Sequence, residues 1–145
     1  MKKPMTLLAA AVLALGVAAA RTPAADAAPA PARPPQVHTV RMLKTGDMVH
    51  FEPANITIKA GDSVRWVNVS GGPHNVSFDK AKTPDDVEPI LARNMPNQID
   101  ELWGPLLADP NATYTISFAG VKPGRYEYFC LPHMPNQMKG TVTVQ

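Results

Sequence analysis

Short segments in which apolar and polar residues alternate recur from residue 56 to the C-terminus, with turn-forming Gly, Pro, Asn and Asp between them. The clearest is residues 112–118, ATYTISF, in which Tyr114, Ile116 and Phe118 share one side and small polar side chains occupy the other. Alternation with a period of two is typical of β-strands that bury one face. Similar segments cover residues 56–58, 63–69, 74–78, 125–130 and 140–144.

These segments are short, and no helices alternate with them in the way that parallel α/β folds require. The pattern predicts an all-β fold, a Greek-key antiparallel β-sandwich. It also predicts the core, because Val64, Trp66 and Asn68 share one face of their segment and Tyr126, Tyr128 and Cys130 share one face of theirs. The aromatic residues expected in this core are Trp66, Tyr114, Phe118, Tyr126 and Tyr128.

Residues 79–110 interrupt the strand pattern. Thr83 followed by Pro84 is typical of a helix cap and first position, and Val87, Ile90 and Leu91 have helical spacing. Beyond Pro96, a second short helical piece is expected, from the apolar residues Ile99, Leu102, Trp103 and Leu106. The segment is too long for a hairpin loop and too apolar for a linker. It either covers an end or edge of the sandwich, or shapes a partner surface or shields a functional site.

The N-terminal residues predict export. Lys2 and Lys3 precede an apolar run and then small residues, which is the layout of a secretory signal peptide over residues 1–20. The run is shorter than the roughly 20 apolar residues of a spanning helix, so no stable membrane insertion is expected. Residues 21–36 are rich in alanine and proline and predict a flexible linker. The folded domain is expected over residues 37–145, in the periplasm or another extracytoplasmic space.

The net charge of the chain does not indicate a strongly charged partner. The formal net charge of +2 includes Lys2 and Lys3, and without them 12 basic residues face 12 acidic ones. No basic stripe indicates nucleic acid. Any partner is expected to recognise an apolar or mixed patch.

Cys130 is the one cysteine of the chain, so it cannot form a disulfide within the chain. Structural zinc, attached haem and iron–sulfur clusters all need more ligands than one thiol and its neighbours supply. A catalytic thiol needs a base and an orienting group, of which His133 supplies the first. One thiolate, two imidazoles and a weak axial thioether form a blue-copper electron-transfer site.

Cys130, His133 and Met138 supply a thiol, an imidazole and a thioether from one loop between two predicted strands. Because the chain must turn back between these strands, the three side chains can converge. Pro132 and Pro135 restrict this loop by fixing φ. A loop of this kind suits a metal whose geometry changes little between oxidation states.

The second imidazole must come from elsewhere. Of the other histidines, His74 follows the loop sequence SGGP and opens a predicted strand, so it lies at a sheet end. His38 adjoins the linker and His50 lies in an early strand or loop, and both are expected to be ordinary side chains.

The sequence resembles the cupredoxin family, closest to its plastocyanin and pseudoazurin type. The resemblance is carried by FCLPHMPNQMKGTVTV at residues 129–144, with the spacing C-x2-H-x4-M, and by FEPANITIKAGDSVRWVNVSGGPHNVSF at residues 51–78. These two blocks frame nearly all of residues 37–145. The departure is the segment 79–110, which is longer and more helical than in the simplest members. Because of this departure, the resemblance does not predict the partner surface, but it still predicts the metal site.

The resemblance implies a ligand set for one copper ion cycling between Cu(I) and Cu(II). His74, Cys130 and His133 correspond to the equatorial ligands and Met138 to the axial one. Two other methionines compete for the axial role: Met134 is adjacent to His133 and is expected to point away from it, and Met95 reaches the site only if the inserted segment folds over it. Gap-filling in the core is expected of Met42 or Met48.

The resemblance also implies roles beside the copper. Asn75 corresponds to a residue whose side chain ties the two ligand loops together by hydrogen bonding. His133 corresponds to the ligand whose ring edge reaches the surface, where electrons leave and redox proteins dock. The apolar patch expected around it consists of Leu131, Pro132, Met134 and Pro135.

A closed four-ligand site favours a one-electron carrier between extracytoplasmic redox partners, working as a monomer. A copper-delivery protein is the alternative, since the chain has seven methionines. An enzyme is not expected, because copper oxidases and nitrite reductases need further copper centres and more histidines than this chain has.

Overall fold

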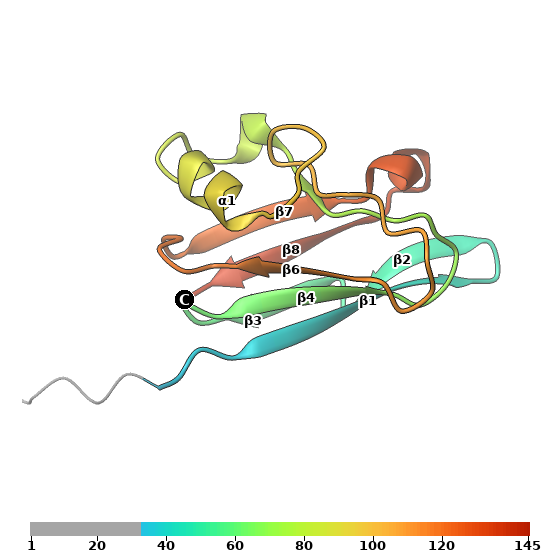
Figure 1. Cartoon of the computed structure of the whole chain (residues 1–145), viewed down its shortest axis with the longest axis horizontal. Coiled ribbons are helices and arrows are strands. Elements are labelled where there is room, and N and C mark those ends of the chain that lie inside the picture. The colour runs from blue at the N-terminus through green and yellow to red at the C-terminus, as the bar shows by residue number, and fades with distance from the viewer. Residues whose placement is uncertain (1–32) are drawn as a thin grey trace, which may run out of the picture. The chain divides into compact units, whose positions relative to one another are not determined.

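The computed structural model describes residues 33–145, in which eight strands form two sheets (Figure 1). One sheet has the order β2-β1-β4-β6 and the other the order β3-β8-β7-β5. The predicted signal peptide, residues 1–20, and residues 21–32 of the predicted linker lie outside the described residues. The first sheet consists of β1 (Val37–Thr45), β2 (Met48–Glu52), β4 (Ser63–Asn68) and β6 (Thr113–Ser117), and the second of β3 (Asn55–Ile58), β5 (Ser77–Phe78), β7 (Gly124–Phe129) and β8 (Lys139–Val144).

The predicted all-β sandwich is confirmed. Antiparallel pairing joins β1 to β2, β4 to β6, β5 to β7 and β7 to β8. Two pairs are parallel, β1 with β4 and β3 with β8. Alternation along one strand carries no information about the direction of its neighbour, so the parallel pairs could not be foreseen.

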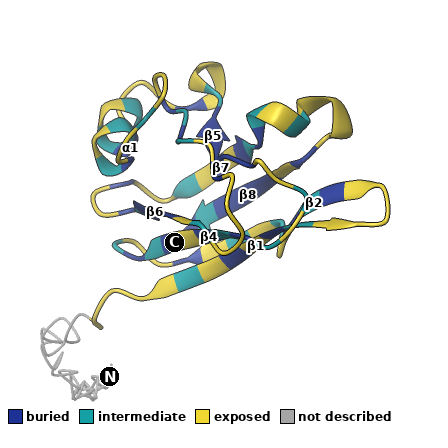
Figure 2. Ribbon diagram, turned by 45° about the vertical axis from the view of Figure 1, so that its right-hand side comes forward, coloured by how far each residue is buried: buried dark blue, intermediate teal, exposed yellow. Residues whose placement is uncertain are grey.

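The buried faces of the two sheets form the core between them (Figure 2). Trp66 and Tyr128 meet edge to face, with ring centroids 5.3 Å apart. All five aromatic residues predicted for the core are buried, and Met42 is buried with them. The expectation for Met48 is wrong, because its side chain is 68% exposed. Met48 opens β2, where it alternates with the buried Val49 and Phe51 and therefore faces solvent.

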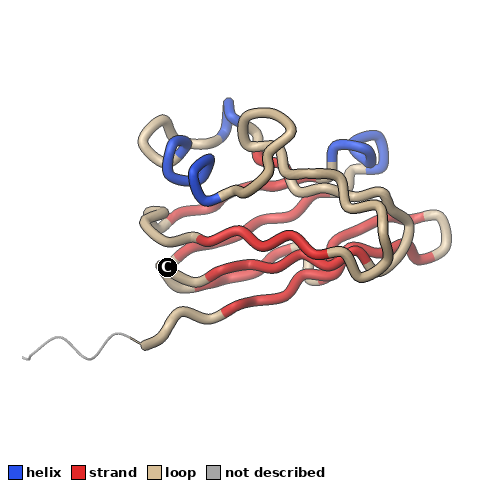
Figure 3. The backbone as a smooth tube through the Cα atoms, viewed as in Figure 1, coloured by secondary structure: helices blue, strands red, loops and turns tan. Residues whose placement is uncertain are grey.

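The insertion, residues 79–110, is mostly loop (Figure 3). It contains a 3-10 helix, η1 (Lys80–Lys82), and one α-helix, α1 (Glu88–Asn94). Thr83 follows η1 and does not cap α1, and its hydroxyl donates to the carbonyl of Asp79. The second predicted helix is wrong. Leu102 has φ of 61°, and its backbone N–H is taken by the Gln98 side chain, so helical hydrogen bonds cannot form there.

The insertion covers one edge of the sandwich. Backbone hydrogen bonds join Phe78 to Leu102 and Gly104 to Val76, each 2.9 Å long, so the chain after α1 pairs with the outer side of β5. On the other sheet, α1 packs against β6. The Asn68 side chain donates to the carbonyl of Leu107 at 3.0 Å and fixes the return of the insertion to the sheet. The edge-covering interpretation is therefore confirmed, and β5 is left with little exposed edge.

Asp62 fastens the start of the described chain to the turn before β4. Its buried carboxylate accepts hydrogen bonds from Arg33, from the backbone N–H of Gln36 and from the His38 ring, at 2.6, 2.9 and 2.8 Å. The backbone N–H of Lys59 is a fourth donor. Burial opposes ionisation of this carboxyl, but the four donors outweigh it and hold the pKa of Asp62 well below its usual range.

Replacing Asp62 with asparagine is expected to lower the free energy of unfolding at pH 7 by about 1–3 kcal/mol, because an amide oxygen is a weaker acceptor for these donors. A depressed folded-state pKa stabilises the protein above the pKa of the unfolded state, about 3.9, and this contribution is lost as pH falls further. Urea unfolding between pH 7 and pH 2 should therefore show the two proteins converging in acid. Asp85→Asn, at an exposed carboxylate, serves as the control, and an equal loss there would contradict the role of Asp62.

None of the helices formed by residues 33–145 is long and apolar enough to cross a bilayer.

Candidate metal centre

His74 lies in the connection from β4 to β5, and its backbone is fixed by the insertion. Its N–H and carbonyl pair with Leu107 at N–O distances of 3.2 and 2.7 Å. The side chain is fully buried, and Nε2 lies 2.9 Å from the carbonyl of Ser70. A carbonyl only accepts, so Nε2 carries the proton and Nδ1 keeps its lone pair. That nitrogen faces Cys130, with 3.7 Å between Nδ1 and Sγ.

Cys130 and His133 lie on the hairpin between β7 and β8. The 3-10 helix η2 (Leu131–Asn136) forms its tip and is followed by Gln137 with φ of 57°. The N–H of Cys130 donates to the carbonyl of Met138, and the N–H of Met138 donates to the carbonyl of His133. These bonds close the hairpin and bring Cys130 and His133 to the same turn.

A buried thiol and two imidazoles meet at this end of the sandwich. The Sγ of Cys130 lies 3.3 Å from Nδ1 of His133, and the three donor atoms of His74, Cys130 and His133 lie within 4.8 Å of one another. Among the residues that the structure describes, they form the one such cluster of His, Cys, Asp or Glu donors. His38 contacts Asp62 instead, and His50 does not join the cluster.

The electrostatics of the cluster suit a metal cation. Burial lowers the pKa of His74, and burial together with the nearby His74 lowers the pKa of His133, so both rings are neutral donors at pH 7. Burial raises the pKa of the Cys130 thiol, while the backbone N–H groups of Asn75 and His133 oppose that rise. The free thiol therefore holds its proton until a metal displaces it. One soft sulfur and two imidazole nitrogens are the donors that copper accepts in both oxidation states.

The methionines near the cluster differ in burial. Met138 is 1% exposed and joins the hairpin that carries Cys130 and His133. Met134 is 51% exposed, as expected if it points away from the site. Met95 is buried in the insertion, where its carbonyl accepts from the Gln98 side chain. Of the three methionines, Met138 is the one that is both buried and joined by backbone hydrogen bonds to the hairpin of Cys130 and His133.

Asn75 connects the two segments that supply the cluster. Its Oδ1 accepts a 2.7 Å hydrogen bond from the N–H of Leu131, directly after Cys130. Its amide nitrogen donates to Ser77 Oγ at 3.0 Å and to the carbonyl of Gly104 at 3.2 Å. The side chain is completely buried, so it ties the His74 segment, the hairpin and the insertion together.

Replacing Asn75 with alanine is expected to cost about 1–3 kcal/mol of folding free energy, because the backbone groups that it satisfies lose their partner. The Leu131 amide should also exchange its hydrogen faster. Urea unfolding and amide exchange of the metal-free protein measure both effects. Asn136→Ala, at an exposed position of the same hairpin, is the matched control. Unchanged exchange at Leu131 would show that Asn75 does not hold the hairpin.

One contributor had no signal in the sequence. Ser70 acts through its backbone carbonyl, which any residue supplies, so no side-chain pattern could identify it.

A β-sandwich that holds a buried thiol and two imidazoles at one end, with donors from the β4–β5 connection and the β7–β8 hairpin, is a cupredoxin. A family model described as copper binding proteins of the plastocyanin/azurin family matches residues 37–145. The chain belongs to the plastocyanin/azurin family of copper-binding proteins.

Similar proteins support the same assignment. A plastocyanin from Scenedesmus fuscus is 37% identical over 109 residues, which cover 74% of this chain and 98% of the relative. A plastocyanin from Nostoc punctiforme is 35% identical, and the match covers 79% of this chain and 78% of the relative. Among solved structures, an oxidised plastocyanin from Dryopteris crassirhizoma has a TM-score of 0.59 and 30% identity, over 74% of this chain and 99% of that one. A pseudoazurin from Sinorhizobium has a TM-score of 0.52 and 30% identity, over 76% and 74%.

Membership of this family identifies the cofactor and the general activity of the chain. Its members bind copper and carry electrons to and from redox partners, and they are not enzymes. The predictions of a copper cofactor, of an electron carrier and of a protein without catalytic activity are therefore confirmed.

Proposed function

We propose that this protein carries single electrons between extracytoplasmic redox partners, using one copper ion held by His74, Cys130 and His133 with Met138 as the axial donor. The observation that carries the proposal is the convergence of the three buried donor atoms within 4.8 Å. Copper in such a site supplies a one-electron cycle between Cu(I) and Cu(II).

The protein's contribution is a site that keeps its shape. The Ser70 carbonyl fixes the His74 ring, the hairpin hydrogen bonds fix Cys130 and His133, and Asn75 joins the two segments. Because His74 and Cys130 are fully buried, water has no access to these two donors. Donors that are held in place need little rearrangement when the charge of the bound ion changes.

His133 is the candidate ligand that reaches the surface. Its side chain is partly exposed, and Pro132, Met134 and Pro135 beside it are exposed, with Leu131 half-buried. These four residues form the His133 patch. An apolar patch around a partly exposed imidazole supports docking of redox proteins there, with short-lived contacts that suit a carrier. We expect the carrier to act as a monomer.

Copper delivery is the second candidate function. It is supported by the exposure of two methionine thioethers, Met48 at 68% and Met134 at 51%, because exposed thioethers can pass Cu(I) between proteins. The burial of His74, Cys130 and Met138 favours the electron carrier, since a delivery site needs ligands that exchange readily.

Spectroscopy of the copper-loaded protein separates the two functions. A carrier should be intensely blue when oxidised, bleach and recover with one electron per copper in cycles of ascorbate and hexacyanoferrate(III), and keep its copper against a competing chelator. A colourless protein that loses copper to the chelator would support delivery and contradict the carrier.

Export is proposed from residues 1–20, whose sequence is typical of a cleaved signal peptide. The mass of the protein recovered from the extracytoplasmic fraction measures this. A mature N-terminus near residue 21 is expected, and an intact Met1 in the cytoplasm would contradict it.

A further inference from the structure

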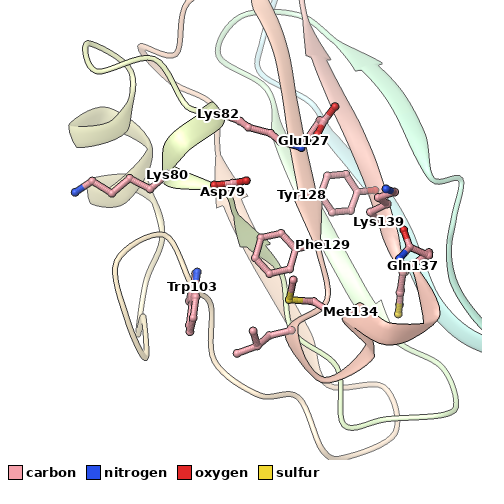
Figure 4. Close-up of a pocket in the computed structure, with 12 residues that line it drawn as sticks. Asp79, Lys80, Lys82, Trp103, Glu127, Tyr128, Phe129, Met134, Gln137 and Lys139 are labelled. Carbon is pink, nitrogen blue, oxygen red and sulfur yellow. Dashed lines mark hydrogen bonds and ion pairs between the residues drawn. The ribbon is translucent and has the colours of Figure 1, made fainter.

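An open groove of about 600 Å³ separates the insertion from the hairpin that carries Cys130 and His133 (Figure 4). Trp103 of the insertion lies on one side of the groove, and Phe129 of β7 and Met134 of η2 lie on the other. Leu131 of η2 also lines the groove. All four side chains are at least partly exposed. The volume lies within the usual range of ligand pockets, about 300–1,000 Å³, and is large enough for an aromatic side chain.

The charges around the groove mostly compensate one another. Lys82 pairs with Glu127 at 2.8 Å. Lys80 pairs with Glu88 and Glu101, and Figure 4 shows its side chain directed away from the groove.

Two charged residues of the lining remain. The Asp79 carboxylate accepts the N–H of Ala81 at 3.0 Å. Lys139 at the rim forms no ion pair with any residue of the described part of the chain. The Asp79 carboxylate has no ion-pair partner in this part of the chain either, so the lining carries one ammonium group and one carboxylate without an ion pair. Lys139 is the register partner of Phe129 on the neighbouring strand, so its ammonium group lies next to the apolar walls. There it complements an apolar side chain that is followed by a carboxylate.

The groove is continuous with the His133 patch, because Leu131 and Met134 belong to both. A protein that inserts a side chain into the groove is thereby brought close to the partly exposed side chain of His133. Buried aromatic anchors contribute most of the affinity in small interfaces, and the surrounding contacts mainly exclude water. The patch alone is apolar, whereas the groove adds a hollow and charged side chains, which are the properties that select a partner.

We propose that the insertion and η2 form a recognition groove for a redox protein, which places an aromatic or large aliphatic side chain between Trp103 and Met134 and an adjacent carboxylate near Lys139. This proposal rests on the proposed electron-carrier function. It gives the insertion a second role besides covering β5, and it makes the insertion the part of the fold that distinguishes one partner from another.

Three dipeptide probes test the groove directly: acetyl-Trp-Asp-amide, acetyl-Trp-Lys-amide and acetyl-Gly-Asp-amide. Each is titrated into the full, Cu(I)-loaded chain and followed by ¹H–¹⁵N NMR. Acetyl-Trp-Asp-amide should shift the Trp103 indole and the Leu131 and Met134 amides. It should bind about tenfold more tightly than acetyl-Gly-Asp-amide and about two- to fivefold more tightly than acetyl-Trp-Lys-amide.

Lys139→Glu, at an exposed position, should reverse the preference between the two Trp probes. Equal binding of all three probes, or shifts centred on Ile99, would overturn the proposal. Ile99 is the reference because it is 54% exposed on the same insertion and does not line the groove.

Electron exchange with succinylated cytochrome c, a redox protein with added carboxylates, tests docking. Trp103→Ala and Met134→Ser should slow this reaction about tenfold, while Ile99→Ser should not. Met134→Ser keeps the test valid if Trp103→Ala misfolds, because Met134 is half exposed. Unchanged rates despite peptide binding would assign the groove to a small ligand and overturn protein docking.

Oxidation by hexacyanoferrate(III), which needs no groove, is measured on the same samples. Failure of that reaction in the wild type would contradict the electron carrier itself. A normal reaction without probe binding would contradict the groove alone.

Discussion

Replacing Cys130 with serine is expected to abolish the intense blue absorption of the oxidised, copper-loaded protein. A serine hydroxyl stays protonated at neutral pH and is a harder donor than a thiolate, so the copper–sulfur bond that gives these centres their colour cannot form. The serine hydroxyl can still form a hydrogen bond with the imidazole nitrogens that lie near Sγ of Cys130, so the loss of folding free energy should stay at about 1 kcal/mol or less. Optical and EPR spectra of copper-loaded wild type and variant measure the first effect.

Met138→Leu is the matched control for that experiment. Met138 is as deeply buried as Cys130, and leucine has a similar volume, so the cost in stability should stay below about 1.5 kcal/mol. This variant should keep a blue centre with a shifted reduction potential, because the axial ligand tunes the potential without supplying the thiolate. A blue centre in Cys130→Ser would refute the proposed ligand set.

Gly140→Ala is expected to destabilise the protein by about 3 kcal/mol or more. A Cβ at this position would collide with the carbonyl oxygen of Ala54 and lie 2.6 Å from the Tyr128 hydroxyl oxygen. The Ala54 carbonyl accepts hydrogen bonds from the Tyr128 hydroxyl and from the N–H of Thr141, so the collision disturbs both bonds. Circular dichroism during urea unfolding measures the loss.

Gly124→Ala provides the comparison, because it also lies at a strand position of the second sheet. There a Cβ would meet the Tyr126 hydroxyl at 3.1 Å, and a small movement of that side chain relieves the contact. A loss of about 1 kcal/mol or less is expected. If the two variants were equally stable, close packing at Gly140 would not be what that position requires.

Patterns of apolar and polar residues within single segments predicted the buried faces of strands, but they did not predict how distant segments pair. Alternation identified the buried faces of β4, β6 and β7, because a strand with one buried face must repeat every two residues. It did not identify the parallel pairing of β1 with β4, which depends on contacts between distant segments. The helix expected after Pro96 does not form. The backbone N–H of Leu102 donates to the Gln98 side chain, and Leu102 has a left-handed conformation, so helical hydrogen bonds are absent there.

The candidate site likewise combines residues that are close together in the sequence with residues that only the fold brings together. His133 and Cys130 are three residues apart, so a turn brings them together, and their spacing was visible in the sequence. His74 was selected through its position after the SGGP loop and through family resemblance. The groove beside Trp103 was not foreseen, because its walls come from the insertion and from the hairpin, and no single segment contains both.

The position of Asp62 has a practical consequence for immobilising this protein. The Asp62 turn and the C-terminal residue Gln145, which pairs with Ala60 and Ile58, lie at one end of the strands, and the β7–β8 hairpin with His133 lies at the other (Figure 1). A tag or a surface linkage joined before Arg33 or after Gln145 therefore leaves the hairpin that carries His133 unobstructed. Electrode films made through either attachment should present the end with the proposed copper site to solution.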